Sequence, residues 1–237
     1  MNRDNPQLIL IPGLAADAVM WRHQLRALPA FWRTSVSTVH FQHDSIEEMA
    51  AALLRQSQGQ LVLCGASMGG IIAMEAVRQA PQRIAALALL GTNARPETEA
   101  MRAARAEAIR LFEDGRAAEV LRANVMLAFH ASRAKDSELT RTYLEFVLGA
   151  GSAALVRQNR AIMARPDARQ HLPAVSCPTL VLCGDSDQLT PPECSQEIAA
   201  LIGHADLKLI ERCGHMLTME RPDAVNAALL SWLGGLG

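Results

Sequence analysis

The fold is decided by residues 60–80, which read QLVLCGASMGGIIAMEAVRQA. Residues 60–64 form a short apolar run, as expected of a strand that is buried on both faces of a parallel sheet. Residues 68–80 follow a helical pattern, so the chain turns sharply from strand to helix around Ser67. Glycines two residues before and after this serine relieve the steric crowding of such a turn. We therefore expect a tight turn that lifts the serine hydroxyl out of the sheet edge.

Similar apolar runs, each followed by a turn, recur on both sides of this stretch. Further strands are expected at residues 7–11, 35–41, 84–90, 179–183 and 205–210. Further helices are expected at residues 17–29, 45–57, 191–202 and 222–234. The alternation predicts an α/β fold with a doubly wound, mostly parallel sheet and right-handed crossovers.

Residues 95–169 interrupt the alternation, because no strand-like run occurs between them. Helical patterns are found instead at residues 97–113, 116–132, 136–148 and 151–164. We interpret residues 95–169 as a helical cap inserted between two strands, and residues 1–94 and 170–237 as the α/β core.

Composition excludes several classes of protein. Of the 237 residues, 50% are hydrophobic, and 23 Lys and Arg balance 24 Asp and Glu. Such a balance lacks the basic clustering of nucleic-acid binders. The longest apolar run, residues 84–90, is far shorter than the roughly 18 residues of a membrane span. The first residues lack the apolar core of a secretion signal. We expect a soluble, cytoplasmic monomer or homodimer without nucleic-acid or membrane partners.

The five cysteines form no C-x-x-C pair and are odd in number. This pattern predicts neither a disulfide framework nor a zinc site, so free buried thiols are expected.

A serine hydroxyl becomes a nucleophile when a histidine base and an orienting carboxylate accompany it. After a turn of this kind the chain order is serine, acid, histidine, with the last two at later strand ends. His215 follows the last predicted strand and meets that order, whereas the other six histidines are expected to be structural. Asp185 and Asp187 compete for the acid position in the loop 184–192. We prefer Asp187, which lies further into the loop and can turn back towards the pocket.

Two backbone N–H groups are candidates to stabilise a developing oxyanion. Met68 follows the serine and lies at a helix N-terminus, where partial positive charge accumulates. The loop after the first strand, Pro12-Gly13-Leu14, offers the N–H of Leu14 as a second donor. An ordinary strand-to-helix turn would have the same sequence there, so both interpretations stay open.

Together these motifs resemble the α/β-hydrolases, in the helical-cap branch that includes 3-oxoadipate enol-lactonases, small carboxylesterases and meta-cleavage C–C hydrolases. The resemblance runs essentially end to end. It rests on the Pro12-Gly13 loop, the turn at 65–69, Gly184-x-x-Asp187-x-x-x-Pro191, and Gly214-His215 before a C-terminal helix. It implies Ser67 as nucleophile, Asp187 as acid, His215 as base, and Leu14 and Met68 as oxyanion donors.

The chain departs from this branch near the first strands. Pro12 replaces a histidine that braces the loop in the family, and residues 39–45 replace the family's D-x-P-G-x-G-x-S loop. We expect the antiparallel strands that usually precede the first parallel strand in this branch to be missing or reduced. None of these departures touches the predicted triad.

The resemblance implies acyl transfer to water, which needs no metal or organic cofactor. We expect a pocket between sheet and cap, although the aromatic residues named for it could instead form the small core of the cap. The substrate-binding candidates are Gly13, Leu189, Met216, Phe129, Tyr143 and Phe146, with Leu14, Met68 and Phe112 nearby.

No Arg or Lys is clearly aimed at the predicted triad. A small to medium, largely apolar carboxylic ester or lactone therefore fits better than a dicarboxylate. An acyl-CoA thioesterase or a C–C bond hydrolase would use the same triad. A non-catalytic ligand-binding module of the same fold is the alternative from another class.

Overall fold

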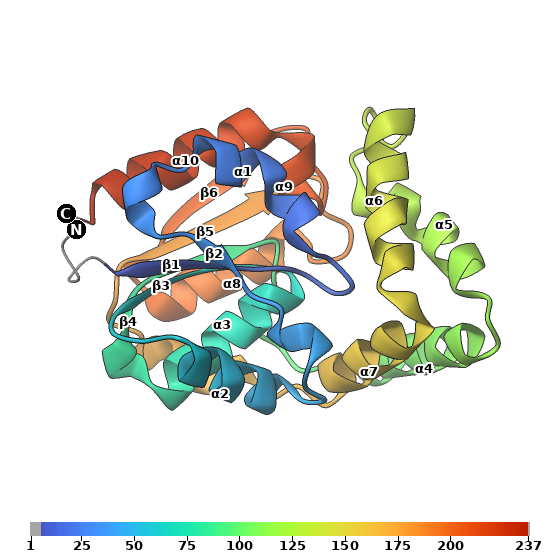
Figure 1. Cartoon of the computed structure of the whole chain (residues 1–237), viewed down its shortest axis with the longest axis horizontal. Coiled ribbons are helices and arrows are strands. Elements are labelled where there is room, and N and C mark those ends of the chain that lie inside the picture. Colours follow the sequence, from blue (N-terminus) through green and yellow to red (C-terminus); the bar gives the residue numbers. More distant parts are fainter. Residues whose placement is uncertain (1–5, 237) are drawn as a thin grey trace.

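A computed structural model describes residues 6–236 and contains one six-stranded sheet. All neighbouring strands pair in parallel, in the order β2-β1-β3-β4-β5-β6 (Figure 1). The strands are β1 (Gln7–Ile11), β2 (Ser35–Val36), β3 (Leu61–Ala66), β4 (Ile84–Leu90), β5 (Thr179–Gly184) and β6 (Asp206–Ile210). The α/β fold with a parallel sheet, predicted from the alternating pattern, is confirmed.

Both faces of the sheet are buried, which explains why its central strands are apolar throughout. In β1, Leu8 and Leu10 pack into one hydrophobic cluster, and Ile9 and Ile11 pack into another on the opposite face. Successive strand side chains point to opposite faces, so a strand covered on both sides needs apolar residues at every position.

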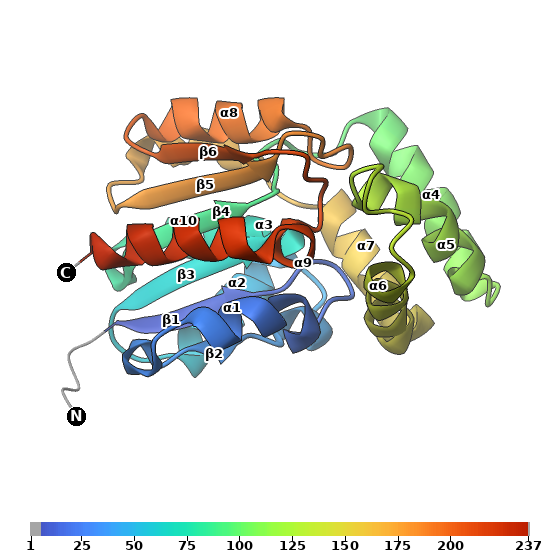
Figure 2. The ribbon, with the colours of Figure 1, turned by 90° about the horizontal axis from the view of Figure 1, so that it is seen from above.

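Helices cover the two faces in separate layers (Figures 1 and 2). One face is covered by α1 (Arg22–Ala27) and α10 (Pro222–Gly234). The other is covered by α2 (Ile46–Gln56), α3 (Met68–Gln79) and α8 (Pro192–Ile202). This is the doubly wound arrangement, and it leaves the carboxyl ends of the strands free to carry functional loops.

The helical insertion lies between β4 and β5 and packs at the carboxyl end of the sheet (Figure 2). Its helices, referred to below as the cap, are α4 (Glu99–Glu113), α5 (Ala117–Ala128), α6 (Ser137–Gly149) and α7 (Gly151–Met163). The predicted helical insertion is confirmed. Within residues 6–236, no helix is long and apolar enough to cross a membrane.

The strand predicted over residues 35–41 is wrong for most of its length. Only β2 is extended, and a 3₁₀ helix, η3 (Val39–Phe41), follows it. Val39 and His40 are both buried. The segment leaves the sheet edge here, and the His40 ring contacts the carbonyl of Ala16 at 2.8 Å, which holds the helical turn against the loop after β1.

Two predicted helices are shorter than their patterns. The helix expected over residues 17–29 begins as a 3₁₀ helix, η1 (Ala18–Trp21), and α1 then ends at Ala27. Pro29 disfavours helical geometry at the residue before it, so the helix ends there. The helix expected over residues 116–132 ends at Ala128, because the next residue is extended and turns inward.

Candidate active site

Ser67 occupies the turn between β3 and α3 in a strained backbone conformation, with φ 53° and ψ −117°. The flanking glycines are required by close packing. A Cβ on Gly65 would strike the carbonyl oxygen of Gly69, and a Cβ on Gly69 would strike that of Ile11. The hydroxyl of Thr92 donates to the Ser67 carbonyl at 2.7 Å. The turn is therefore fixed from several sides, and it presents a partly exposed serine.

The structure brings together the three side chains predicted as a triad. The Oγ atom of Ser67 lies 2.9 Å from Nε2 of His215. The Nδ1 atom of His215 lies 2.8 Å from Oδ2 of Asp187. Asp187 follows β5 and His215 follows β6, so two adjacent parallel strands deliver them to the same edge of the sheet. The result is a continuous hydrogen-bonded chain from a buried carboxylate to a serine hydroxyl.

The carboxylate of Asp187 is held by its own loop. Its Oδ1 accepts the N–H groups of Leu189 and Thr190, both at 2.9 Å. Its Oδ2 accepts the Thr190 hydroxyl at 2.8 Å as well as His215. These bonds orient one oxygen towards the imidazole.

Asp185, the competing acid, has a different role in the structure. Its oxygens accept the N–H groups of Arg212 at 2.9 Å and Cys213 at 3.2 Å. Asp185 thus orders the start of the loop that carries His215, whereas Asp187 contacts the imidazole itself.

The electrostatics couple the histidine to its carboxylate. Burial alone would raise the pKa of Asp187, but the charge of His215 and the hydrogen bonds hold that pKa below its usual value. Burial alone would lower the pKa of His215, but Asp187 and, more weakly, Glu220 raise it above its usual value. Both groups that raise it are carboxylates. The site is thus an ionised acid beside a histidine of increased proton affinity.

The predicted oxyanion donors lie beside Ser67. A Cβ built on Gly13 would come within 3.4 Å of the Ser67 Cβ, so the backbone of this loop lies close to the serine. Met68 is the first residue of α3. In the hydrogen bonding of residues 6–236, the N–H groups of Leu14 and Met68 have no acceptor. Both groups are therefore free to bind an oxygen of a substrate.

The remaining substrate-binding candidates fall into two groups. Met216 is buried next to His215, whereas Leu189 is 41% exposed. The aromatic candidates stack edge to face within the cap: Phe129 and Tyr143 have ring centroids 5.3 Å apart, and Tyr143 and Phe146 have centroids 5.5 Å apart. Burial raises the pKa of Tyr143 to about 12. This is the geometry of a small cap core, and contact with a substrate stays a prediction for these three residues.

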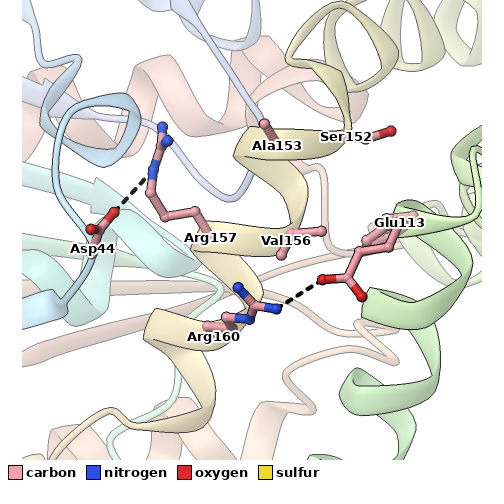
Figure 3. A pocket seen from close by; sticks show the side chains of 8 residues that line it. Asp44, Glu113, Ser152, Ala153, Val156, Arg157 and Arg160 are labelled. Atoms are coloured by element: carbon pink, nitrogen blue, oxygen red, sulfur yellow. Dashed lines mark hydrogen bonds and ion pairs between the residues drawn. The ribbon is translucent and has the colours of Figure 1, made fainter.

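A cavity of about 580 Å³ opens along α7 (Figure 3). Phe112 is the one predicted pocket residue that lines it, and none of the three triad candidates does. Two ion pairs cross its wall: Arg157 with Asp44 at 3.5 Å, and Arg160 with Glu113 at 2.8 Å. The cavity is therefore separate from the hydrogen-bonded chain at Ser67.

Two site residues were missed by the sequence reasoning. Gly91 has a left-handed φ of 49°, and a Cβ on it would come within 3.3 Å of Asp187 Oδ2 and 3.6 Å of His215 Nδ1. Its signal was available, since a glycine follows the strand ending at Leu90. Glu220 is buried and accepts the N–H groups of Gly214 and His130, each at 2.8 Å. No local pattern could indicate it, because His130 lies 90 positions away.

Among residues 6–236, no group of three or more His, Cys, Asp or Glu side chains is arranged to hold a metal ion. All five cysteines are free thiols. Cys64, Cys183 and Cys213 are buried, as expected, which raises the pKa of each, whereas Cys177 and Cys194 are partly exposed.

Comparison with known proteins places these observations in a wider context. Residues 33–222 match the family described as serine aminopeptidase, S33. That range includes Ser67, Asp187 and His215. Among curated proteins, one from Serratia proteamaculans with the name "Putative carbamate hydrolase RutD" is 27% identical to this chain. The match covers 96% of this chain and 91% of that protein.

Solved structures agree with this match. A thermophilic esterase from Thermogutta terrifontis is 27% identical, with a TM-score of 0.87 over 98% of this chain and 90% of its own. The enol-lactonase from Burkholderia xenovorans LB400 is 22% identical, with a TM-score of 0.88 over 98% of this chain and 94% of its own. At 22% identity, the likeness to the enol-lactonase shows a shared fold.

Proposed function

Because the chain belongs to the serine aminopeptidase S33 family of α/β-hydrolases, we propose that it is a serine hydrolase whose nucleophile is Ser67. Its substrate on this proposal is a small to medium, largely apolar carboxylic ester or lactone. The observation that carries the proposal is the hydrogen-bonded chain Ser67–His215–Asp187, with bonds of 2.9 and 2.8 Å. Nucleophile, base and orienting acid at these distances are what acyl transfer requires.

The proposed reaction has two halves. Ser67 Oγ attacks the substrate carbonyl while His215 Nε2 takes its proton, and Asp187 stabilises the imidazolium that forms. The N–H groups of Leu14 and Met68 bind the oxyanion. The imidazolium then gives its proton to the leaving alcohol, which departs and leaves an acyl-enzyme. Water, deprotonated by His215, then attacks the acyl carbon. The bond between the acyl carbon and Ser67 Oγ breaks, the imidazolium returns its proton to Oγ, and the acid is released.

The local charges favour an uncharged substrate. The two groups that raise the pKa of His215, Asp187 and Glu220, are both carboxylates. An anionic substrate bound beside the ionised Asp187 would be repelled at close range. Met216, buried at 7% exposure, adds apolar surface next to the histidine. An apolar ester or lactone meets these conditions better than a dicarboxylate.

The first test replaces the nucleophile. Ser67→Ala should lower kcat for p-nitrophenyl butyrate by about 10⁴-fold or more, because the residual rate comes from binding and the oxyanion donors alone. The unfolding temperature should stay close to that of the wild type. The variant should also lose labelling by a fluorophosphonate probe.

A matched control is Ser186→Ala, since the Ser186 hydroxyl donates to Asp185 at 2.8 Å and not to the histidine. Its activity and labelling should equal those of the wild type. Ester hydrolysis that survives unchanged in Ser67→Ala would refute the proposal.

Carbamate hydrolysis is the second candidate. It is favoured by the match to RutD over 96% of the chain. A carbamate carbonyl can be attacked by the same serine, but its nitrogen makes the acylated enzyme less electrophilic and slower to hydrolyse. A matched pair, a phenyl ester and a phenyl carbamate of similar size, separates the two. Many turnovers of the carbamate would support the second candidate, whereas a halt after one equivalent of phenol would support the ester.

A further inference from the structure

The loop that carries Leu14 is a tight turn in an unusual conformation. The N–H of Ala16 donates to the carbonyl of Gly13 at 3.2 Å, which closes the turn. Ala15 has a φ of 55°, in the left-handed region that residues other than glycine rarely adopt. Such a conformation persists when the surrounding structure holds it.

A glutamine from the cap holds this turn. Gln158 lies on α7 and is fully buried, at 0% exposure. Its Oε1 accepts the N–H of Ala15 at 2.7 Å, and its Nε2 donates to the carbonyl of His40 at 3.0 Å. One amide therefore bridges the turn after β1 and the segment after β2, which are 143 and 118 positions away along the chain.

His40 holds the same turn from the other side. Its Nε2 donates to the carbonyl of Ala16 at 2.8 Å. Burial lowers the pKa of His40, which favours the neutral ring. The backbone carbonyl of His40 is also the acceptor for Gln158. The two side chains thus form one buried network around residues 13–16.

The network bears on the Leu14 N–H through the geometry of a peptide unit. The carbonyl of Gly13 and the N–H of Leu14 belong to one planar trans peptide and point in opposite directions. Because the Gly13 carbonyl is engaged by Ala16, the direction of the Leu14 N–H follows from the closed turn. Gly13, whose carbonyl belongs to this peptide, lies next to the serine, since a Cβ on it would come within 3.4 Å of the Ser67 Cβ. Opening the turn would rotate the donor away from the serine.

We infer that Gln158 is a positioning residue, through which the cap helix α7 holds the Leu14 N–H in place for the oxyanion. The inference rests on the proposed function and deepens it. Gln158 itself touches no reacting atom. The cap on this view contributes to the rate of the chemical step as well as to the enclosure of the substrate.

The test is Gln158→Met, which keeps the length of the side chain and removes both hydrogen bonds. We expect kcat for p-nitrophenyl butyrate to fall by about 10- to 100-fold, since loss of an oxyanion donor costs about 10²- to 10³-fold and here the donor is displaced and not deleted. KM should change by less than about twofold. The affinity for an alkyl boronic acid, whose adduct with Ser67 is tetrahedral and negative, should fall by the same factor as kcat.

The matched control is Arg157→Met, at the next position of the same helix. Arg157 donates to the Phe41 carbonyl at 2.6 Å and pairs with Asp44 (Figure 3), and neither bond involves residues 13–16. Arg157 therefore links α7 to the segment after β2 without a hydrogen bond to the turn. Its kcat and boronic acid affinity should equal those of the wild type.

A second variant, His40→Phe, removes the hydrogen bond from the His40 ring to the Ala16 carbonyl. It tests the inference if Gln158→Met fails to fold. It should lower kcat with little change in KM. The inference would be overturned if Gln158→Met folds and keeps kcat within twofold of the wild type. If Gln158→Met does not fold, the same result in His40→Phe would overturn it. So would an equal loss in Arg157→Met. In these cases the proposed function would still stand, as long as Ser67→Ala is inactive and the wild type is not.

Discussion

Among residues 6–236, the buried charged side chains include two clusters that differ in what they can do. One is the pair Asp187–His215 beside Ser67. The other joins the two ends of the cap, where Glu97 accepts Arg105 at 3.0 Å through one oxygen and Arg165 through the other. In both clusters the carboxylate is almost completely buried.

The difference lies in the partner of each carboxylate. A guanidinium keeps its proton in proteins. Each oxygen of Glu97 accepts a hydrogen bond from a different guanidinium, that of Arg105 or Arg165, so this cluster is permanently ionic. The imidazole of His215 can both gain and lose a proton, and its second nitrogen faces a hydroxyl. Burial of charge is common to both clusters. A partner that can gain and lose a proton, next to a nucleophile, distinguishes the candidate active site.

The largest expected effect tests the reactive cluster. Asp187→Asn should lower kcat by about 10⁴-fold, which corresponds to about 5.5 kcal/mol of transition-state stabilisation. The amide can donate to His215 Nδ1, which leaves the proton on Nε2 and prevents that nitrogen from accepting the proton of Ser67. The unfolding temperature should change little, because the remaining oxygen can still accept the loop N–H groups.

The matched control for this change is Asp185→Asn, in the same loop. It should lower kcat by less than about tenfold, since Asp185 contacts backbone N–H groups and not the imidazole. Steady-state kinetics and thermal melts of both variants check the prediction. Similar losses in the two variants would contradict the assignment of Asp187.

The second prediction concerns the cap cluster. Glu97→Gln should lower the free energy of unfolding by about 3 to 5 kcal/mol, because Arg165 would remain buried without its counter-charge. Chemical denaturation measures this loss. The kcat per folded molecule should stay within a few fold of the wild type.

The exposed pair of Glu107 and Arg110 supplies the control, since Glu107→Gln should leave stability unchanged within error. A stable Glu97→Gln protein with a large loss of kcat would mean that both clusters serve the reaction, and the contrast between them would fail.

The smallest expected effect is a dependence on pH. The neutral form of His215 is the base, and Asp187 raises the pKa of this histidine above its usual 6.5. The rate constant kcat/KM should therefore rise with pH through a pKa above 6.5 and level off on the alkaline side. One unit below that pKa it should be about tenfold lower, or about 1.4 kcal/mol.

In the Asp187→Asn variant, the residual kcat/KM should rise at a lower pH than in the wild type, because the negative charge that raises the pKa of His215 is gone. An acidic limb at or below pH 6.5 in the wild type would show that Asp187 does not raise the pKa of this histidine.

Much of the candidate site could be predicted from local sequence. Ser67 was indicated by glycines two positions away on each side, and His215 and Asp187 by their places after strands. These signals are local because a sharp turn and a strand end are local events. The structure places the three side chains in contact, as the chain order predicts.

The supporting residues carried no such signal. Gln158 is one polar residue in a helical pattern, and its partner Ala15 lies 143 positions away. Glu97 and Arg165 are 68 positions apart and are ordinary surface residue types until the cap folds back on the core. Their functions depend on burial, and burial at these positions depends on packing between distant segments.

Local sequence is enough to predict the α/β fold, the helical insertion after β4 and the turn at Ser67, because periodicity and glycine placement act within a few residues. Three features require the folded chain: the choice of the aspartate that meets the histidine, the helical turn at residues 39–41, and the contact between the cap and the turn carrying Leu14. Those outcomes depend on which distant groups share one buried space. Hydrogen bonds formed there, such as the 2.7 Å bond between Ala15 and Gln158, have no counterpart in local sequence.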